Sequence, residues 1–161
     1  MKYIREMAET YTLADAWRLN NRVNLMLLDR LDEEQLAVTA NPRARSVADQ
    51  FAHMHNVRIM WLEPRAPELA QSLTKIGKGS AAKAALKDAL EASAAAFGGL
   101  FAEAEKTGKM KVYFKRGPIA FLGYVLAHEA HHRAQIILHL KYAGRPVDKM
   151  FGFSLWEWEK I

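Results

Sequence analysis

The sequence has 161 residues, which is the usual length of one domain, and we expect a single domain over residues 1–161. Half of the residues are hydrophobic and 25% are charged, a balance that excludes a disordered or fibrous chain. There is no cysteine, so disulfides, thiolate metal ligands and a cysteine nucleophile are excluded. Any bound metal must therefore be held by His, Asp or Glu.

The formal net charge is +5, but Lys and Arg are spread along the chain and gather only at residues 109–116. Charge alone therefore gives little support to a nucleic-acid partner. The first residues lack the unbroken apolar stretch of a secretory signal. No segment approaches the roughly 18 apolar residues that a membrane-spanning helix needs. We expect a soluble, cytoplasmic protein with no membrane partner.

Helical periodicity recurs in four long segments that are separated by Pro and Gly. The first runs from Ile4 or Leu13 to Leu31. The second begins at Ser46, an N-cap candidate with Asp49 three residues later, and runs to about residue 63, before a proline. The connection that follows, residues 64–79, contains a stretch at 67–73 that could form two helical turns.

The third segment is Ala-rich and runs from Ser80 to about residue 105, since Ala and Leu favour helices strongly. After a connection at 108–117, the fourth runs from Pro118 to Tyr142 and is ended by Gly144 and a following proline. The C-terminal tail carries Phe151, Phe153, Trp156 and Trp158 and is expected to pack back on the helices. The sequence predicts an all-α fold, a four-helix bundle with long connections and a C-terminal aromatic tail.

Five of the six histidines fall in two short helical windows, residues 51–58 and 127–135. His128 and His132 are four residues apart, which on a helix is about 40° around the axis and about 6 Å along it. Both imidazoles can therefore point at one ion. Two imidazoles make a weak site, and zinc-like centres normally have three protein ligands.

His53 and His55 are the candidates for a third ligand. They are two residues apart and so point to opposite sides of the second helix. The apolar positions of that helix form an arc with His53 at its edge and His55 farther off, which favours His53, although the helix register must decide. His131 and His139 are expected not to be ligands; His139 is about 10 Å along the axis from His132.

Several sequence blocks resemble the DinB/YfiT-like family of four-helix metal-binding proteins, which is unrelated to the DNA polymerase of similar name. The blocks are Asn21-Arg22 with residues 31–36, residues 46–53 running on to Arg58 and Trp61-Leu62, and residues 128–135 (HEAHHRAQ). The resemblance implies that His53, His128 and His132 bind zinc, nickel or a similar divalent ion. Ala134 stands where the family commonly has Gly, a change that concerns packing rather than ligation.

The resemblance also implies a chemistry. The family contains thiol-dependent transferases and isomerases, in which the open metal position takes the thiol of a low-molecular-weight cofactor.

Gln135 and Asp49 are candidates for holding imidazoles in orientation, although Asp49 as a simple helix cap is the plainer interpretation. Glu129 is expected on a solvated flank, and Arg58 as a surface charge or an anion contact.

Three functions are consistent with these features. The first is a metal-dependent enzyme, a transferase or hydrolase, that activates a thiol or water for a small-molecule substrate. The second is a metal or small-ligand binding module without catalysis. The third is a basic helical protein that binds nucleic acid through residues 109–116, where Tyr113 and Phe114 lie among Lys109, Lys111, Lys115 and Arg116. A homodimer is expected, through the aromatic tail and the Ala-rich helix.

Overall fold

Four long helices make up most of the computed structural model, which describes residues 11–79, 81–112 and 114–161. They are α1 (Leu13–Arg30), α3 (Val47–Leu62), α5 (Lys83–Thr107) and α6 (Gly117–Tyr142). The short elements are α2 (Glu33–Leu36), α4 (Pro67–Ala70), α7 (Lys149–Ser154) and a 3-10 helix at Trp158–Lys160. No β-strand occurs in the described part of the chain, which confirms the all-α prediction.

The helix starts follow the caps in the sequence. Thr12 caps α1, and the alternative start at Ile4 lies outside the described residues. Ser46 caps α3 as predicted: its hydroxyl accepts the Asp49 N–H at 3.1 Å, while the Asp49 carboxylate accepts the Ser46 N–H at 3.3 Å. Ser80, the predicted start of the third long helix, lies outside the described residues, and α5 begins at Lys83.

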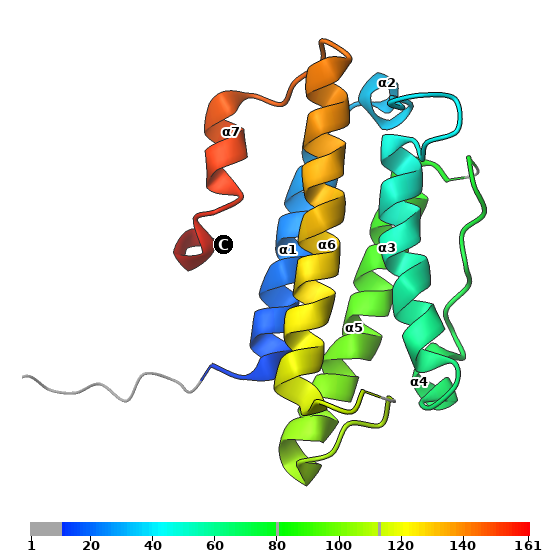
Figure 1. Cartoon of the computed structure of the whole chain (residues 1–161), viewed down its shortest axis with the longest axis vertical. Helices are drawn as coiled ribbons and strands as arrows, with labels where there is room; N and C mark the ends of the chain where they lie inside the picture. Colours follow the sequence, from blue (N-terminus) through cyan, green and yellow to red (C-terminus); the bar gives the residue numbers. More distant parts are fainter. Residues whose placement is uncertain (1–10, 80, 113) are drawn as a thin grey trace, which may run out of the picture.

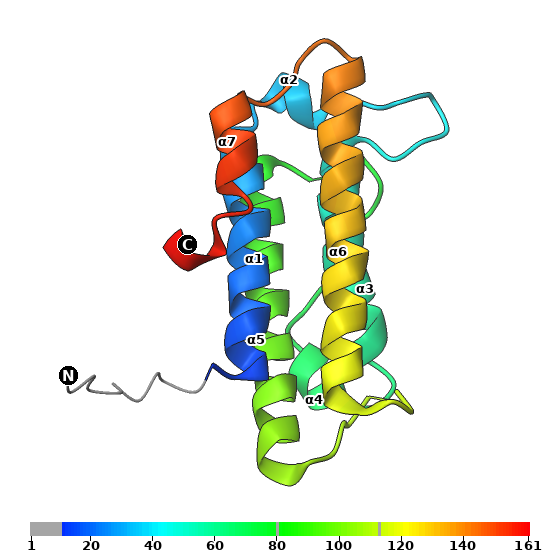
Figure 2. The same cartoon turned by 60° about the vertical axis from the view of Figure 1, so that its left-hand side comes forward.

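The four helices run in two directions (Figures 1 and 2). α1 and α6 point one way along the bundle, while α3 and α5 point the other way. α3 and α5 are neighbours that run in the same direction. The connection between them therefore has to return along the length of the bundle before α5 can begin. Around the bundle, α1 packs on α5, α5 on α3, α3 on α6, and α6 on α1.

The core is divided into two apolar clusters by a layer of buried polar residues. One cluster surrounds Leu27, Phe51 and Ile136, and the other surrounds Trp17, Phe97 and Phe121. Between them every long helix contributes at least one buried polar side chain to a connected network: Asn20, Asn21 and Asn24 from α1, Arg58 from α3, Ser93 from α5 and Glu129 from α6.

The C-terminal tail packs back on the first of these clusters, as predicted. Leu155 is buried there, with Phe151 and Trp158 partly buried against the same cluster, although Phe153 and Trp156 are exposed. No helix of the described residues is long and apolar enough to cross a membrane.

Candidate metal centre

Three histidines from two helices converge on one point between α3 and α6. His53, His128 and His132 each offer a ring nitrogen, and these nitrogens all lie within 4.8 Å of one another. The Nε2 atoms of His128 and His132 are 3.1 Å apart. Two nitrogens bound to one tetrahedral zinc at 2.0–2.1 Å are about 3.3 Å apart, so this pair is already spaced for a shared ion.

His132 is held in orientation by a neighbouring amide. Its Nδ1 lies 2.6 Å from Oε1 of Gln50, and Nε2 of Gln50 donates in turn to Oε1 of Gln135 at 2.9 Å. Because an amide oxygen can only accept, the Nδ1–H of His132 donates and its Nε2 presents a lone pair to the cluster. Ligating imidazoles in metal sites are commonly fixed in this way through their second nitrogen.

Burial keeps the three imidazoles neutral. Burial, together with repulsion from a protonated His128 or His53, lowers the pKa of His132 to about 3. Burial and the positive charge of Arg45 lower the pKa of His53 to about 4. The pKa of His128 is also lowered by burial, although Glu129 opposes this. Neutral imidazole is the form that binds a metal, so the ligand nitrogens are available at neutral pH.

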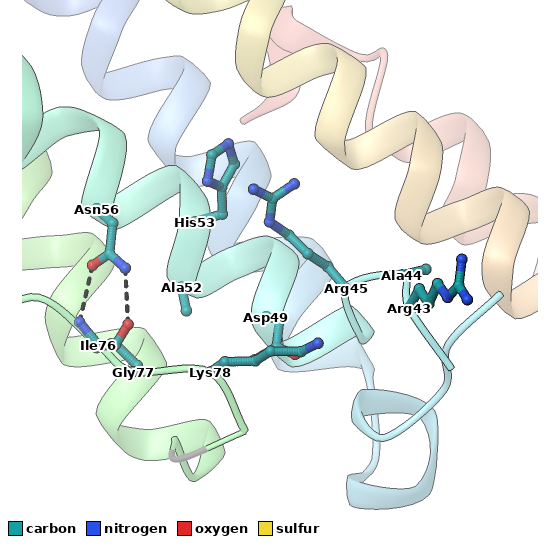
Figure 3. A pocket seen from close by; sticks show the side chains of 10 residues that line it. All are labelled: Arg43, Ala44, Arg45, Asp49, Ala52, His53, Asn56, Ile76, Gly77 and Lys78. Atoms are coloured by element: carbon teal, nitrogen blue, oxygen red, sulfur yellow. Dashed lines mark hydrogen bonds between the residues drawn. The ribbon is translucent and has the colours of Figure 1, made fainter. Parts of the chain in front are cut away.

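A cavity of about 520 Å³ opens beside His53. Its wall is formed by the first turns of α3 and by two connections, residues 43–45 and 76–78 (Figure 3). The long return connection is held against α3 at this point, because Asn56 exchanges two hydrogen bonds with the backbone of Ile76 at 2.8 and 2.9 Å. A small molecule in the cavity would lie next to the histidine cluster.

Comparison with known protein families places the chain in one of them. The model of the DinB family matches residues 7–160, nearly the whole sequence. The chain belongs to the DinB family. No curated protein matches the sequence.

His55 does not join the cluster of this DinB-family chain. Its two ring nitrogens lie 2.9 Å from the carbonyl oxygen of Ala89 and 3.0 Å from that of Thr74, and the side chain is buried. It thereby fastens α3 to α5 and to the return connection. The helix register thus directs His53 toward α6 and His55 away from it, as the apolar arc of the sequence favoured.

The two residues expected to orient imidazoles act differently. Asp49 accepts hydrogen bonds from the backbone of Ser46 and, at 2.7 Å, of Gly79, and so acts as the helix cap of the plainer interpretation. Gln135 reaches His132 only through Gln50, and its own amide nitrogen lies 2.9 Å from Nε2 of His131. Gln50 was not predicted to orient a histidine, although an amide three residues before His53, on an inward position of the same helix, was a usable signal.

The predictions for Arg58 and Glu129 were wrong, because both side chains are buried, at 1% and 2% exposure. Nε of Arg58 donates to Glu129 at 2.8 Å, and the remaining N–H groups reach Leu90, Ser93, Asn21 and the same carboxylate. All five guanidinium N–H groups are therefore satisfied. Burial alone would raise the pKa of Glu129, but the charge and hydrogen bonds of Arg58 hold it below its usual value.

The basic connection at residues 109–116 lies apart from the histidine cluster. Lys111 pairs with Glu68 at 2.9 Å, and Phe114 packs its ring against Trp61, Phe121 and Tyr124. Tyr113 lies outside the described residues. Phe114 therefore anchors the connection to the bundle rather than presenting a face on which a base could stack.

Proposed function

We propose that this DinB-family protein binds one divalent ion, zinc or nickel, through His53, His128 and His132, and uses it to activate a thiol or water. The convergence of the three ring nitrogens within 4.8 Å carries the proposal. Three imidazoles suit zinc-like ions, and three protein ligands leave a further position for a substrate.

The side chains around the cluster have defined tasks in this proposal. Gln50 fixes the tautomer of His132, and burial keeps the imidazoles neutral. Among the described residues the donor set holds no carboxylate, so these ligands do not reduce the charge of the ion. When bound, a divalent ion of undiminished charge lowers the pKa of a thiol or water toward neutrality. The cavity beside His53 gives the small-molecule substrate its approach.

The reaction class that fits is transfer to or from a low-molecular-weight thiol, with hydrolysis as the counterpart when water is activated. A binding module without catalysis would use the same three histidines. The two are separated by turnover: the ion-loaded protein is expected to consume electrophiles in the presence of a thiol, and a binding module would not.

Elemental analysis of untagged protein tests the metal site. We expect one divalent ion per chain in the wild type and loss of that ion in His128→Ala. His139→Ala is the matched control, because His139 lies on the same helix outside the cluster and should leave the metal content unchanged. A folded wild-type protein that takes up no zinc or nickel from a metal-supplemented buffer would contradict the proposal.

A further inference from the structure

Cationic side chains dominate the cavity beside His53. Arg43, Arg45 and Lys78 line it, against the single carboxylate of Asp49 (Figure 3). That carboxylate is already occupied by the backbone N–H groups of Ser46 and Gly79. Within the residues that the structure describes, neither Arg43 nor Arg45 forms an ion pair. Positive charge thus lines the approach to a cluster whose donor atoms, among the described residues, are all imidazole nitrogens.

Of these cations, Arg45 is the one whose side chain reaches toward the histidine cluster. In Figure 3 its guanidinium reaches toward the imidazole of His53, whereas Arg43 points away from it. A substrate group that meets Arg45 would therefore also be close to the ion.

The backbone that carries Arg45 is fixed on both sides. Residue 46 is the N-cap of α3, and the chain at Val47 is tied back to Val38 by an N–H to carbonyl bond of 2.9 Å. Within the loop, the side chain of Asn41 accepts the N–H groups of Arg43 and Ala44 at 2.9 and 3.0 Å. Arg45 is thereby presented from an ordered turn at the start of α3, two helical turns before His53.

We propose that Arg45 determines substrate specificity by pairing with an anionic group, a carboxylate or a phosphate, of the small molecule that enters the cavity. The inference rests on the proposed function, because the same molecule would supply the thiol or other group that takes the open metal position. A guanidinium binds either anion through paired N–H donors, and Lys78 and Arg43 add to the attraction at longer range. The site would thus select small anions over neutral or cationic molecules of equal size.

Three small thiols of different charge test the proposal. Mercaptopropionate is anionic, mercaptoethanol neutral and cysteamine cationic, while the thiol is common to all. Protein loaded with Co²⁺, which three-imidazole sites accept, reports thiol binding through a sulfur-to-cobalt absorption band. We expect wild-type protein to bind mercaptopropionate at least about tenfold more tightly than mercaptoethanol, with cysteamine weakest. Raising the ionic strength should reduce the difference.

Substitution of Arg45 tests whether this residue causes the preference for the anionic thiol. Arg45→Gln is expected to remove most of it while leaving the affinity for mercaptoethanol and the cobalt content unchanged, and Arg45→Lys should restore part of it. Arg18→Gln is the matched control: Arg18 is an exposed arginine near the start of α1, at the far end of the bundle, and should change nothing. Carboxylate and phosphate are separated by competition with acetate and inorganic phosphate.

Two failures are distinguishable. A protein that takes up no divalent ion contradicts the proposed function. A cobalt-loaded protein that binds the three thiols equally or not at all, or whose preference survives Arg45→Gln, overturns the role of Arg45 and leaves the metal site standing.

Discussion

The same two helices, α3 and α6, build two clusters of ionisable residues with opposite character. His53 and His128 stand at an accessible site where neutral imidazoles converge and leave ligand nitrogens for an ion. Arg58 lies five residues after His53, and Glu129 lies one residue after His128. Both are buried and charged, and every N–H of the Arg58 guanidinium forms a hydrogen bond. Position in the sequence hardly separates the two clusters. What separates them is whether the surrounding helices supply enough partners to satisfy the groups completely.

The largest expected effect comes from breaking the buried cluster. Arg58→Met leaves Glu129 as a buried carboxylate without its cation, which should lower the free energy of unfolding by about 3–5 kcal/mol. Urea unfolding of the metal-free protein measures it. The matched control is Arg18→Met, which removes an exposed pair with Asp15 and should cost less than about 1 kcal/mol. Equal costs for the two variants would show that the buried pair is not what holds the four helices together.

Metal-linked stability should separate His53 from His55. Zinc at about a hundredfold excess over its dissociation constant should stabilise the wild type by about 3 kcal/mol. His53→Ala should abolish this gain, while His55→Ala should lower the stability of the metal-free protein and still respond to zinc. Thermal unfolding with and without zinc measures both effects. A zinc response that survives in His53→Ala and is lost in His55→Ala would reverse the assignment.

The amide chain behind His132 should have a smaller effect on the metal. Gln50→Leu removes the acceptor for Nδ1 of His132 and should weaken zinc binding about 10–100-fold without abolishing it. Gln135→Leu, one bond farther from the imidazole, should weaken it less. Competition with a coloured chelator gives both affinities. If Gln135→Leu weakened zinc binding more than Gln50→Leu, orientation of His132 by Gln50 could not explain the loss of affinity.

Burial of the histidines should also make the stability of the metal-free protein depend on pH. Histidines in the unfolded chain titrate near pH 6.5, whereas His53 and His132 in the folded chain titrate at about 4 and about 3. Below about pH 6.5 the unfolded state binds more protons, so the free energy of unfolding should fall as the pH falls toward 4. Urea unfolding at several pH values measures the slope. The double variant His53→Ala/His132→Ala should flatten it; an unchanged slope would assign it to other groups.

Helix positions were readable from the sequence because they depend on local signals. The N-cap Ser46, the left-handed Gly144 after the end of α6, the periodic apolar residues and the i,i+4 histidine pair act within one or two turns. Arg58 and Glu129 were misjudged because their burial depends on Asn20, Asn21 and Asn24 of α1, far away in the sequence. A charged residue on a helix surface looks the same in sequence whether water or another helix satisfies it.

The ordered turn at residues 38–46 and the return connection at 76–78 carry the cavity residues that can be substituted during evolution. The histidines stand on helices whose packing fixes them, while the cavity wall that holds Arg43, Arg45 and Lys78 belongs to connections. These side chains are exposed, so replacing them should leave the buried contacts between helices in place. Under the proposed function, a few loop substitutions would therefore change the substrate while leaving the bundle and the three histidines in place.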